Sequence, residues 1–196
     1  MAWFSPRRLL AKLLPPEVPR RALTDPKAYR REPLDPAAIS VVPARSEHFA
    51  EIGRMSADIY VNEGYALPSQ RKWLEDVAGR AGHGAMFVAL EAGRRVLGSV
   101  MLAKPPSPLS ELSGPGEADV RLLIVARFAR GQGVGSALMR AVIARGREES
   151  LTALVLWTQA TMESAQRMYE RLGFKRFPAL DKATPVRTFL TYRYEL

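Results

Sequence analysis

The sequence predicts an α/β (α+β) fold with a central mixed, twisted sheet of about seven strands flanked by four helices. Residues 119–147 read as a strand, a glycine-rich turn and a helix, and the apolar run at 151–158 reads as the next strand. A helix between two consecutive strands indicates a parallel βαβ unit. Residues 85–90 and 96–103 are apolar runs joined by a short turn, as in an antiparallel hairpin. Parallel and antiparallel pairs together predict a mixed sheet.

The elements before and after this centre follow from apolar spacing and from turn residues. Ser46 is a suitable N-cap for the first helix, and Gly173 is well placed to end the last one. The last helix carries Ala165, Met168, Tyr169 and Leu172 on one face. We therefore expect helices at Ser46–Tyr65, Ser69–Arg80 and Met162–Gly173, strands at Ile39–Val42, Phe174–Phe177 and Arg187–Tyr194, and a loop at Pro105–Glu117.

The composition describes one globular domain with a basic extension. Residues 1–36 contain seven prolines, which prevent long regular elements, and a short leucine-rich piece with basic residues at Leu9–Leu14. We interpret 1–36 as a basic, proline-rich N-terminal extension and 37–196 as the folded domain. Hydrophobic content of 47% and charged content of 25% are ordinary for a soluble domain. No apolar run approaches the roughly 20 residues that span a membrane.

Two further totals limit the chemistry. The chain has no cysteine, which excludes disulfides, thiolate metal ligands and a cysteine nucleophile and is compatible with the cytoplasm. No other metal-ligand motif is present, so no metal site is expected. A net charge of +9 favours polyanionic partners, of which coenzyme A and RNA are two.

The glycine-rich turn is the most informative motif. Gly131, Gly133 and Gly135 follow the central strand and open a helix, so backbone N–H groups at the helix start would face an approaching anion. A P-loop would need Lys before Ser or Thr, but Gly135 is followed directly by Ser136. A dinucleotide site would need an acid at the end of the next strand, where Gln159 stands. A tight turn without any ligand is the remaining alternative.

Two motifs in this order resemble the GNAT superfamily of acyl-CoA-dependent N-acyltransferases. The first is Arg130-x-x-Gly133-x-Gly135 after a strand. The second is Ala165-x-x-x-Tyr169-x-x-Leu172-Gly173-Phe174, at the spacing of that family's last conserved block. The element order from Ile39 to Leu196 is similar to the whole GNAT fold. Met162 departs from the pattern, since many members have asparagine there, and it puts a side-chain amide contact to the cofactor in doubt.

The resemblance implies that acetyl-CoA is the cosubstrate. The pantetheine would lie along the backbone of Leu123, Ile124 and Val125. The pyrophosphate would lie on the turn, with Arg130 beside it, and would contact the backbone of Gly131, Gln132, Gly133, Val134, Gly135 and Ser136.

The resemblance also implies direct attack of an amine on the thioester. Tyr169 occupies the position of the family's proton donor to sulfur, although its apolar face would equally suit a core tyrosine. Asp119, or second Glu117, is the candidate base, and an ion pair with an arginine is the alternative role of such a carboxylate. The acceptor pocket is expected near the first helices and the Pro105–Glu117 loop, with Tyr60, Glu63, Tyr65 and Trp73 available.

The acceptor itself stays open. The predicted reaction is acetyl transfer to a primary amine on a small molecule or peptide. The alternatives are an amine on RNA or on a ribosomal protein, suggested by the +9 charge, and a non-catalytic module that senses acyl-CoA. We also allow for a homodimer.

Overall fold

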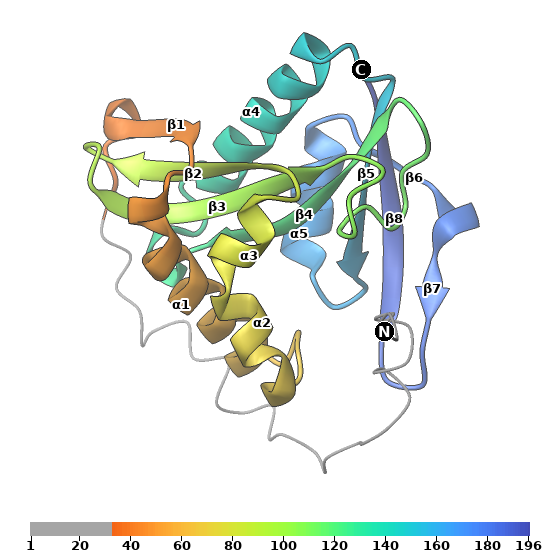
Figure 1. Ribbon diagram of the computed structural model, residues 1–196, viewed down its shortest axis with the longest axis horizontal. Coiled ribbons are helices and arrows are strands. Elements are labelled where there is room, and N and C mark those ends of the chain that lie inside the picture. Colours follow the sequence, from red (N-terminus) through yellow and green to blue (C-terminus); the bar gives the residue numbers. More distant parts are fainter. Residues whose placement is uncertain (1–32) are drawn as a thin grey trace.

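A computed structural model describes residues 33–196, so the leucine-rich piece at 9–14 lies outside the described residues (Figure 1). The helices are α1 Ser46–Asn62, α2 Arg71–Glu75, α3 Val77–Ala81, α4 Val134–Glu148 and α5 Glu163–Arg171. The strands are β1 Ile39–Pro43, β2 Ala85–Glu91, β3 Arg95–Ala103, β4 Glu117–Val125, β5 Ala153–Gln159, β6 Lys175–Arg176, β7 Lys182–Ala183 and β8 Thr188–Glu195.

The strands within 33–196 form one mixed sheet, which confirms the predicted fold class. Their order is β1-β2-β3-β4-β5-β8-β6, with β7 paired to β8. β4 and β5 form the one parallel pair among these strands, and the others are antiparallel. The predicted βαβ unit and hairpin are both present. The parallel pair divides the sheet into two antiparallel halves, one from the earlier and one from the later part of the chain.

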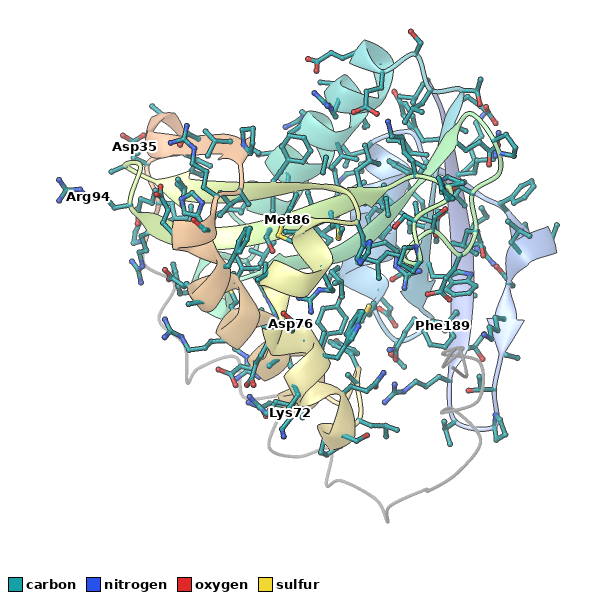
Figure 2. The ribbon with its side chains drawn as sticks, in the orientation of Figure 1. Asp35, Lys72, Asp76, Met86, Arg94 and Phe189 are labelled. Carbon is teal, nitrogen blue, oxygen red and sulfur yellow. The ribbon has the colours of Figure 1, made fainter. Side chains whose placement is uncertain are left out.

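Helices cover both faces of the sheet. Figure 1 shows α1, α2 and α3 in front of the strands and α4 and α5 behind them. The front layer packs through a cluster that contains Ile52 of α1 and Val77 of α3 against Met86 and Val88 of β2. Figure 2 shows Met86 beside α3. The larger core lies behind, where Leu138 and Val142 of α4 are among the buried residues.

The two central strands separate from each other along their length. β4 pairs with β5 only from Glu117 to Asp119, opposite residues 153–155, and the rest of β4 has no ladder on that side. On its other edge β4 carries a bulge, because the two residues Leu122 and Leu123 lie opposite Val100 alone. Leu122 has a φ of 51°, a conformation that a leucine rarely adopts. The residues from Arg121 to Leu123 are half-buried although β4 is central.

Three expected elements differ from the structure. The helix predicted at Ser69–Arg80 is two short helices, because the chain turns at Asp76 and its side chain accepts the Gly79 N–H at 2.9 Å (Figure 2). The strand predicted at Phe174–Phe177 is reduced to β6, and β7 was not predicted. The first helix ends at Asn62 and not at Tyr65, and its N-cap is Arg45 and not Ser46; His48 Nδ1 accepts the Arg45 N–H at 3.0 Å.

Leu34, which we assigned to the N-terminal extension, is buried in the larger core cluster. Its N–H donates to Gln132 Oε1 at 2.8 Å. The packed part of the chain therefore includes residues just before the expected boundary at 37, and it reaches the glycine-rich turn.

The fold predicts that Gly98 tolerates no side chain. A Cβ on Gly98 would lie 2.4 Å from the Ile124 carbonyl oxygen, so β3 would have to move away from β4. We expect Gly98→Ala to lower the free energy of unfolding by roughly 1–3 kcal/mol, measured by urea denaturation. Gly82→Ala is the control, since a Cβ there meets no atom within 4 Å and should change stability by less than about 0.5 kcal/mol. Equal effects would contradict this account.

Candidate active site

The glycine-rich turn has the geometry of an anion-binding helix start. Gly131 and Gly133 have φ values of 76° and 85°, which explains why glycine occupies both positions. The first hydrogen bond within α4 runs from the Ala137 N–H to the Gly133 carbonyl. The N–H groups of Gly133 to Ser136 thus precede the helical ladder at the positive end of the helix dipole.

Gly135 is required for a different reason. A Cβ there would lie 3.0 Å from Met168 Sδ of α5 and 3.5 Å from Val125 Cγ2 of β4. The start of α4 is therefore packed closely between the end of β4 and α5. This contact brings the glycine-rich turn, the end of β4 and the helix that carries Tyr169 together.

The arginines of the turn are bound to Glu63, at the end of α1. Arg130 donates to both carboxylate oxygens of Glu63, at 3.0 and 2.8 Å, and Arg127 Nε donates to Oε1 at 2.9 Å. Arg130 Nε also donates to the Val125 carbonyl at 3.2 Å. Glu63 was expected in the acceptor pocket, and here its carboxylate binds two arginines of the glycine-rich turn.

Tyr169 is buried in a group of aromatic side chains. Its ring centroid lies 5.9 Å from those of Phe174 and Tyr192. Burial raises the pKa of the Tyr169 phenol well above its usual range, and the phenol of Tyr60 adds to this rise. Burial also raises the pKa of Tyr60 to about 12, partly opposed by Arg121. Both phenols are therefore protonated donors at neutral pH.

The carboxylate of Asp119 is fully buried, and backbone N–H groups donate hydrogen bonds to it. It accepts the N–H groups of Glu111 at 2.7 Å, Leu112 at 3.0 Å and Ser113 at 2.7 Å. Arg121 lies 3.8 Å away. These bonds hold the long loop between β3 and β4 against the start of β4. The sequence predicted the position of this carboxylate but gave no sign of its three amide partners.

Glu117, the second candidate base, is paired as well. Arg193 of β8 donates to Oε1 and the Gly114 N–H donates to Oε2 at 3.0 Å. Burial works to raise the pKa of Glu117, but these two donors outweigh it and the pKa is lowered. Glu117 and Asp119 both lie where β4 and β5 are still paired.

Comparisons with known proteins place this arrangement in a family. The sequence profile described as "Acetyltransferase (GNAT) family" matches residues 48–174. The chain belongs to the GNAT acetyltransferase family. This confirms the resemblance stated from the two motifs.

Relatives and solved structures agree with the family. N-acetyltransferase 8F1 of Mus musculus is 35% identical over 96 residues, 48% of this chain and 41% of that protein. Mycothiol acetyltransferase of Cellulomonas flavigena is 32% identical over 173 residues, 85% of this chain and 43% of that protein. The chain thus spans less than half the length of these curated relatives. The yncA protein of Salmonella typhimurium, solved with its cofactor acetyl-CoA, has a TM-score of 0.61 at 17% identity over 81% of this chain and 94% of its own.

A cavity of about 620 Å³ lies beside the β3–β4 loop of this GNAT domain. Its lining comes from the β3–β4 loop, from β5 and from the segment around β7, and it includes Glu111, Leu112, Trp157, Leu180, Asp181 and Lys182. The loop that Asp119 holds therefore forms one wall. Lys182 Nζ lies 5.4 Å from the centroid of the Trp157 ring. Of these residues the sequence singled out only the loop, because β7 was not predicted.

The four residues expected to bind the acceptor are not all together. The rings of Tyr60 and Tyr65 make an edge contact at 6.5 Å between centroids. Trp73 is 43% exposed on α2 and stacks with Arg80. The Tyr65 carbonyl accepts from Gln159 and from Arg187, which sequence analysis did not identify. No pattern in the sequence connects these partners, since they are 94 and 122 residues away from Tyr65.

Two kinds of feature are absent from the described residues, 33–196. This range holds no group of three or more His, Asp or Glu side chains placed to bind a metal ion. It also holds no helix with the length and apolar character needed to cross a membrane.

Asp119→Asn should loosen the β3–β4 loop and leave β4 in place. The amide keeps the size of the side chain but places an NH₂ donor against backbone N–H groups. We expect the free energy of unfolding to fall by roughly 1–3 kcal/mol, and hydrogen exchange of the Glu111–Ser113 amides to become faster. Asp58→Asn is the control, because Asp58 forms an exposed ion pair with Arg71. Unchanged exchange in the loop would show that Asp119 does not hold it.

Proposed function

We propose that this chain is an N-acetyltransferase that moves the acetyl group of acetyl-CoA directly to a primary amine. One observation carries the proposal: the glycine turn with its arginines follows a strand that has separated from its parallel neighbour. Membership of the GNAT family and the presence of acetyl-CoA in a similar fold support acetyl-CoA as the cosubstrate. The absence of cysteine means that no thiol acyl-enzyme forms on this chain.

In the proposed complex, each part of acetyl-CoA meets a different element. The diphosphate contacts the backbone from Gly131 to Ser136. The pantetheine follows Leu123 to Val125, which β5 leaves uncovered on one edge. The thioester then lies close to the bulge, with the acceptor on the side of the 620 Å³ cavity. A strand edge suits pantetheine because its two amides can pair with backbone groups as another strand would.

The reaction needs a bond to form and a bond to break at one carbon. The neutral amine nitrogen attacks the thioester carbon, the carbonyl oxygen becomes negative, and the C–S bond then breaks. A backbone N–H near Val125 stabilises the oxyanion. The products are an amide and the thiol of CoA, after the nitrogen loses one proton and the sulfur gains one.

Tyr169 assists the departing sulfur. Burial raises its pKa and keeps the phenol protonated, so Tyr169 can give its proton to the departing sulfur as charge develops there; solvent then reprotonates the phenolate, which would be costly to keep in this buried site. On the other side, the carboxylates of Asp119 and Glu117 are already bound to donors. We propose that water takes the ammonium proton and that Asp119 acts through the loop that it holds.

Net charge gives little guidance on the acceptor class. Residues 33–196 contain 21 Lys and Arg and 17 Asp and Glu, a net charge of +4. Residues 1–32 contain eight Lys and Arg and three Asp and Glu, a net charge of +5. Slightly more than half of the net charge that suggested an RNA-linked acceptor, +5 of +9, thus belongs to residues 1–32. We favour a small or peptide amine, and we infer that the enzyme works in the cytoplasm.

Release of free thiol from acetyl-CoA tests the function directly. A panel of small amines, peptides with free N-termini, lysine peptides and aminoacyl-tRNA supplies the acceptors, and the cysteine-free protein gives no background. Thiol release that depends on one acceptor class supports the enzyme. Tight CoA binding with no turnover on any acceptor would favour the sensing module instead.

Gly133→Val should weaken CoA binding. A β-branched residue at a φ of 85° is strained, and its side chain would cover the N–H groups that the diphosphate needs. We expect calorimetry to give an affinity at least about tenfold lower, equivalent to about 1.4 kcal/mol. Gly82→Ala should bind CoA as the unmodified protein does. Equal affinities for both variants would remove the turn from the site.

Tyr169→Phe should reduce kcat while keeping the ring and its packing. Loss of a donor to the leaving group is typically worth about 10²–10⁴-fold, with CoA affinity and melting temperature nearly unchanged. Tyr192→Phe is the matched control, because it removes the hydroxyl of a neighbouring buried tyrosine that donates to Glu170. Normal turnover by Tyr169→Phe would make Tyr169 a core residue and solvent the proton source.

A further inference from the structure

Residues 63–65, which we call the strap, cross the open end between β4 and β5. On one side Glu63 binds Arg127 and Arg130, which follow β4. On the other, the Tyr65 carbonyl accepts from Gln159 Nε2 at the end of β5, at 2.9 Å. Arg187, just before β8, donates to the Tyr65 and Gly64 carbonyls at 2.9 and 3.0 Å. The strap thus connects the cofactor turn to the later half of the sheet.

The backbone of the strap is fixed by the end of α1. The Glu63 N–H donates to the Ile59 carbonyl at 3.1 Å and the Gly64 N–H to the Val61 carbonyl at 3.1 Å. Gly64 has a φ of 77°, and the next turn closes where the Ala66 N–H donates to the Tyr60 carbonyl at 2.7 Å. A helix end of this kind holds the Glu63 side chain in one place.

Glu63 makes three charge-assisted hydrogen bonds, and two of them form a parallel pair with Arg130. Its side chain is 11% exposed, so solvent screens these bonds weakly, whereas Arg127 and Arg130 are 36% and 40% exposed. The guanidinium of Arg130 is also bound to the Val125 carbonyl, on the last residue of β4. One carboxylate thus sets the position of two cations from the segment that leads into α4, and one of these cations is also bound to the last residue of β4.

We propose that Glu63 is the positioning residue for the diphosphate of acetyl-CoA: it holds Arg127 and Arg130, in the segment that leads into α4, and couples that segment to the strap. The proposal rests on the cofactor site proposed above. A phosphate needs cations in a fixed place, because ordering free arginine side chains on binding costs conformational entropy. Glu63 orders both arginine side chains when the protein folds, so that they are already fixed when the ligand binds. The negative charge of Glu63 itself repels the diphosphate. Ordering is inferred to be the larger effect because the Arg130 pair is bidentate.

The loss of affinity in a Glu63 variant should depend on whether the ligand carries a diphosphate. CoA and ADP both carry a diphosphate, whereas pantetheine carries none. Glu63→Gln keeps the size of the side chain but offers one acceptor oxygen instead of two. We expect titration calorimetry to give about tenfold weaker binding of CoA and of ADP, and unchanged binding of pantetheine.

Glu149→Gln is the matched control. Glu149 also lies between two cations, Lys104 and Arg145, and its side chain is 17% exposed. It follows the C-terminal end of α4, about 24 Å along the helix from Gly133 at 1.5 Å per residue. Loss of a comparable ion-pair cluster there should leave the binding of all three ligands unchanged.

Hydrogen exchange tests the coupling to the strap. In the unmodified protein, CoA should slow exchange of the Gly64 and Ala66 amides, because occupied arginines hold Glu63 more firmly. In Glu63→Gln the same amides should respond little to saturating CoA. A purely structural role of Glu63 would change the exchange rates without CoA but not their response to it.

Three results would overturn the proposal: unchanged or tighter CoA binding by Glu63→Gln, an equal loss of pantetheine and ADP binding, or an equal loss with Glu149→Gln. Failure of the cofactor site itself gives a different pattern. If Gly133→Val binds CoA normally, the turn is not the diphosphate site and the assignment of Glu63 falls with it. If Gly133→Val binds CoA weakly but Glu63→Gln does not, the cofactor site stands and only Glu63 is wrongly assigned.

Discussion

The separation of β4 from β5 is the constraint on which the rest of the structure depends. Two parallel strands in mid-sheet normally satisfy each other's backbone groups along their whole length. Here the ladder ends at Asp119 and Val155, and the bulge at Leu122 turns the remainder of β4 aside. An uncovered strand edge inside a sheet is unfavourable unless a ligand or another peptide segment forms hydrogen bonds with its backbone groups. The same opening explains why the residues from Arg121 to Leu123 are only half-buried in a central strand.

Charged groups stabilise this opening at both ends. At the paired end, Glu117 binds Arg193 of β8, and Asp119 holds the β3–β4 loop. At the open end, Glu63 binds the arginines that follow β4, and Arg187 binds the strap. These contacts connect the two halves of the sheet where the backbone ladder does not. Electrostatic and amide contacts thus replace missing strand pairing around the proposed site.

The sequence predicted the centre of the fold because its signals are local. The strand, the glycine turn and the helix from Asp119 to Arg147 need no distant partner to be recognised, and the same is true of the Tyr169 motif. The sequence could not show the bulge at Leu122, because a leucine with positive φ is imposed by neighbouring strands. The helix at Ser69–Arg80 was misjudged because Asp76 has an ordinary helical neighbourhood in sequence and caps a new helix only in three dimensions.

The roles of the acidic residues were the hardest to predict. Asp119, Glu117 and Glu63 were all chosen as carboxylates near the expected thioester or acceptor. Their partners are backbone amides eight or fewer residues away for Asp119, but arginines 64 to 76 residues away for Glu63 and Glu117. Contacts over such separations leave no periodic pattern.

The place of β8 between β5 and β6 has a similar long-range character. During synthesis, β5, β6 and β7 leave the ribosome before the strand that pairs with all three. Until residues 188–195 emerge, β6 and β7 therefore have no partner strand and β5 has only its short ladder with β4, and a chaperone would find the longest exposed edge of this half on β5.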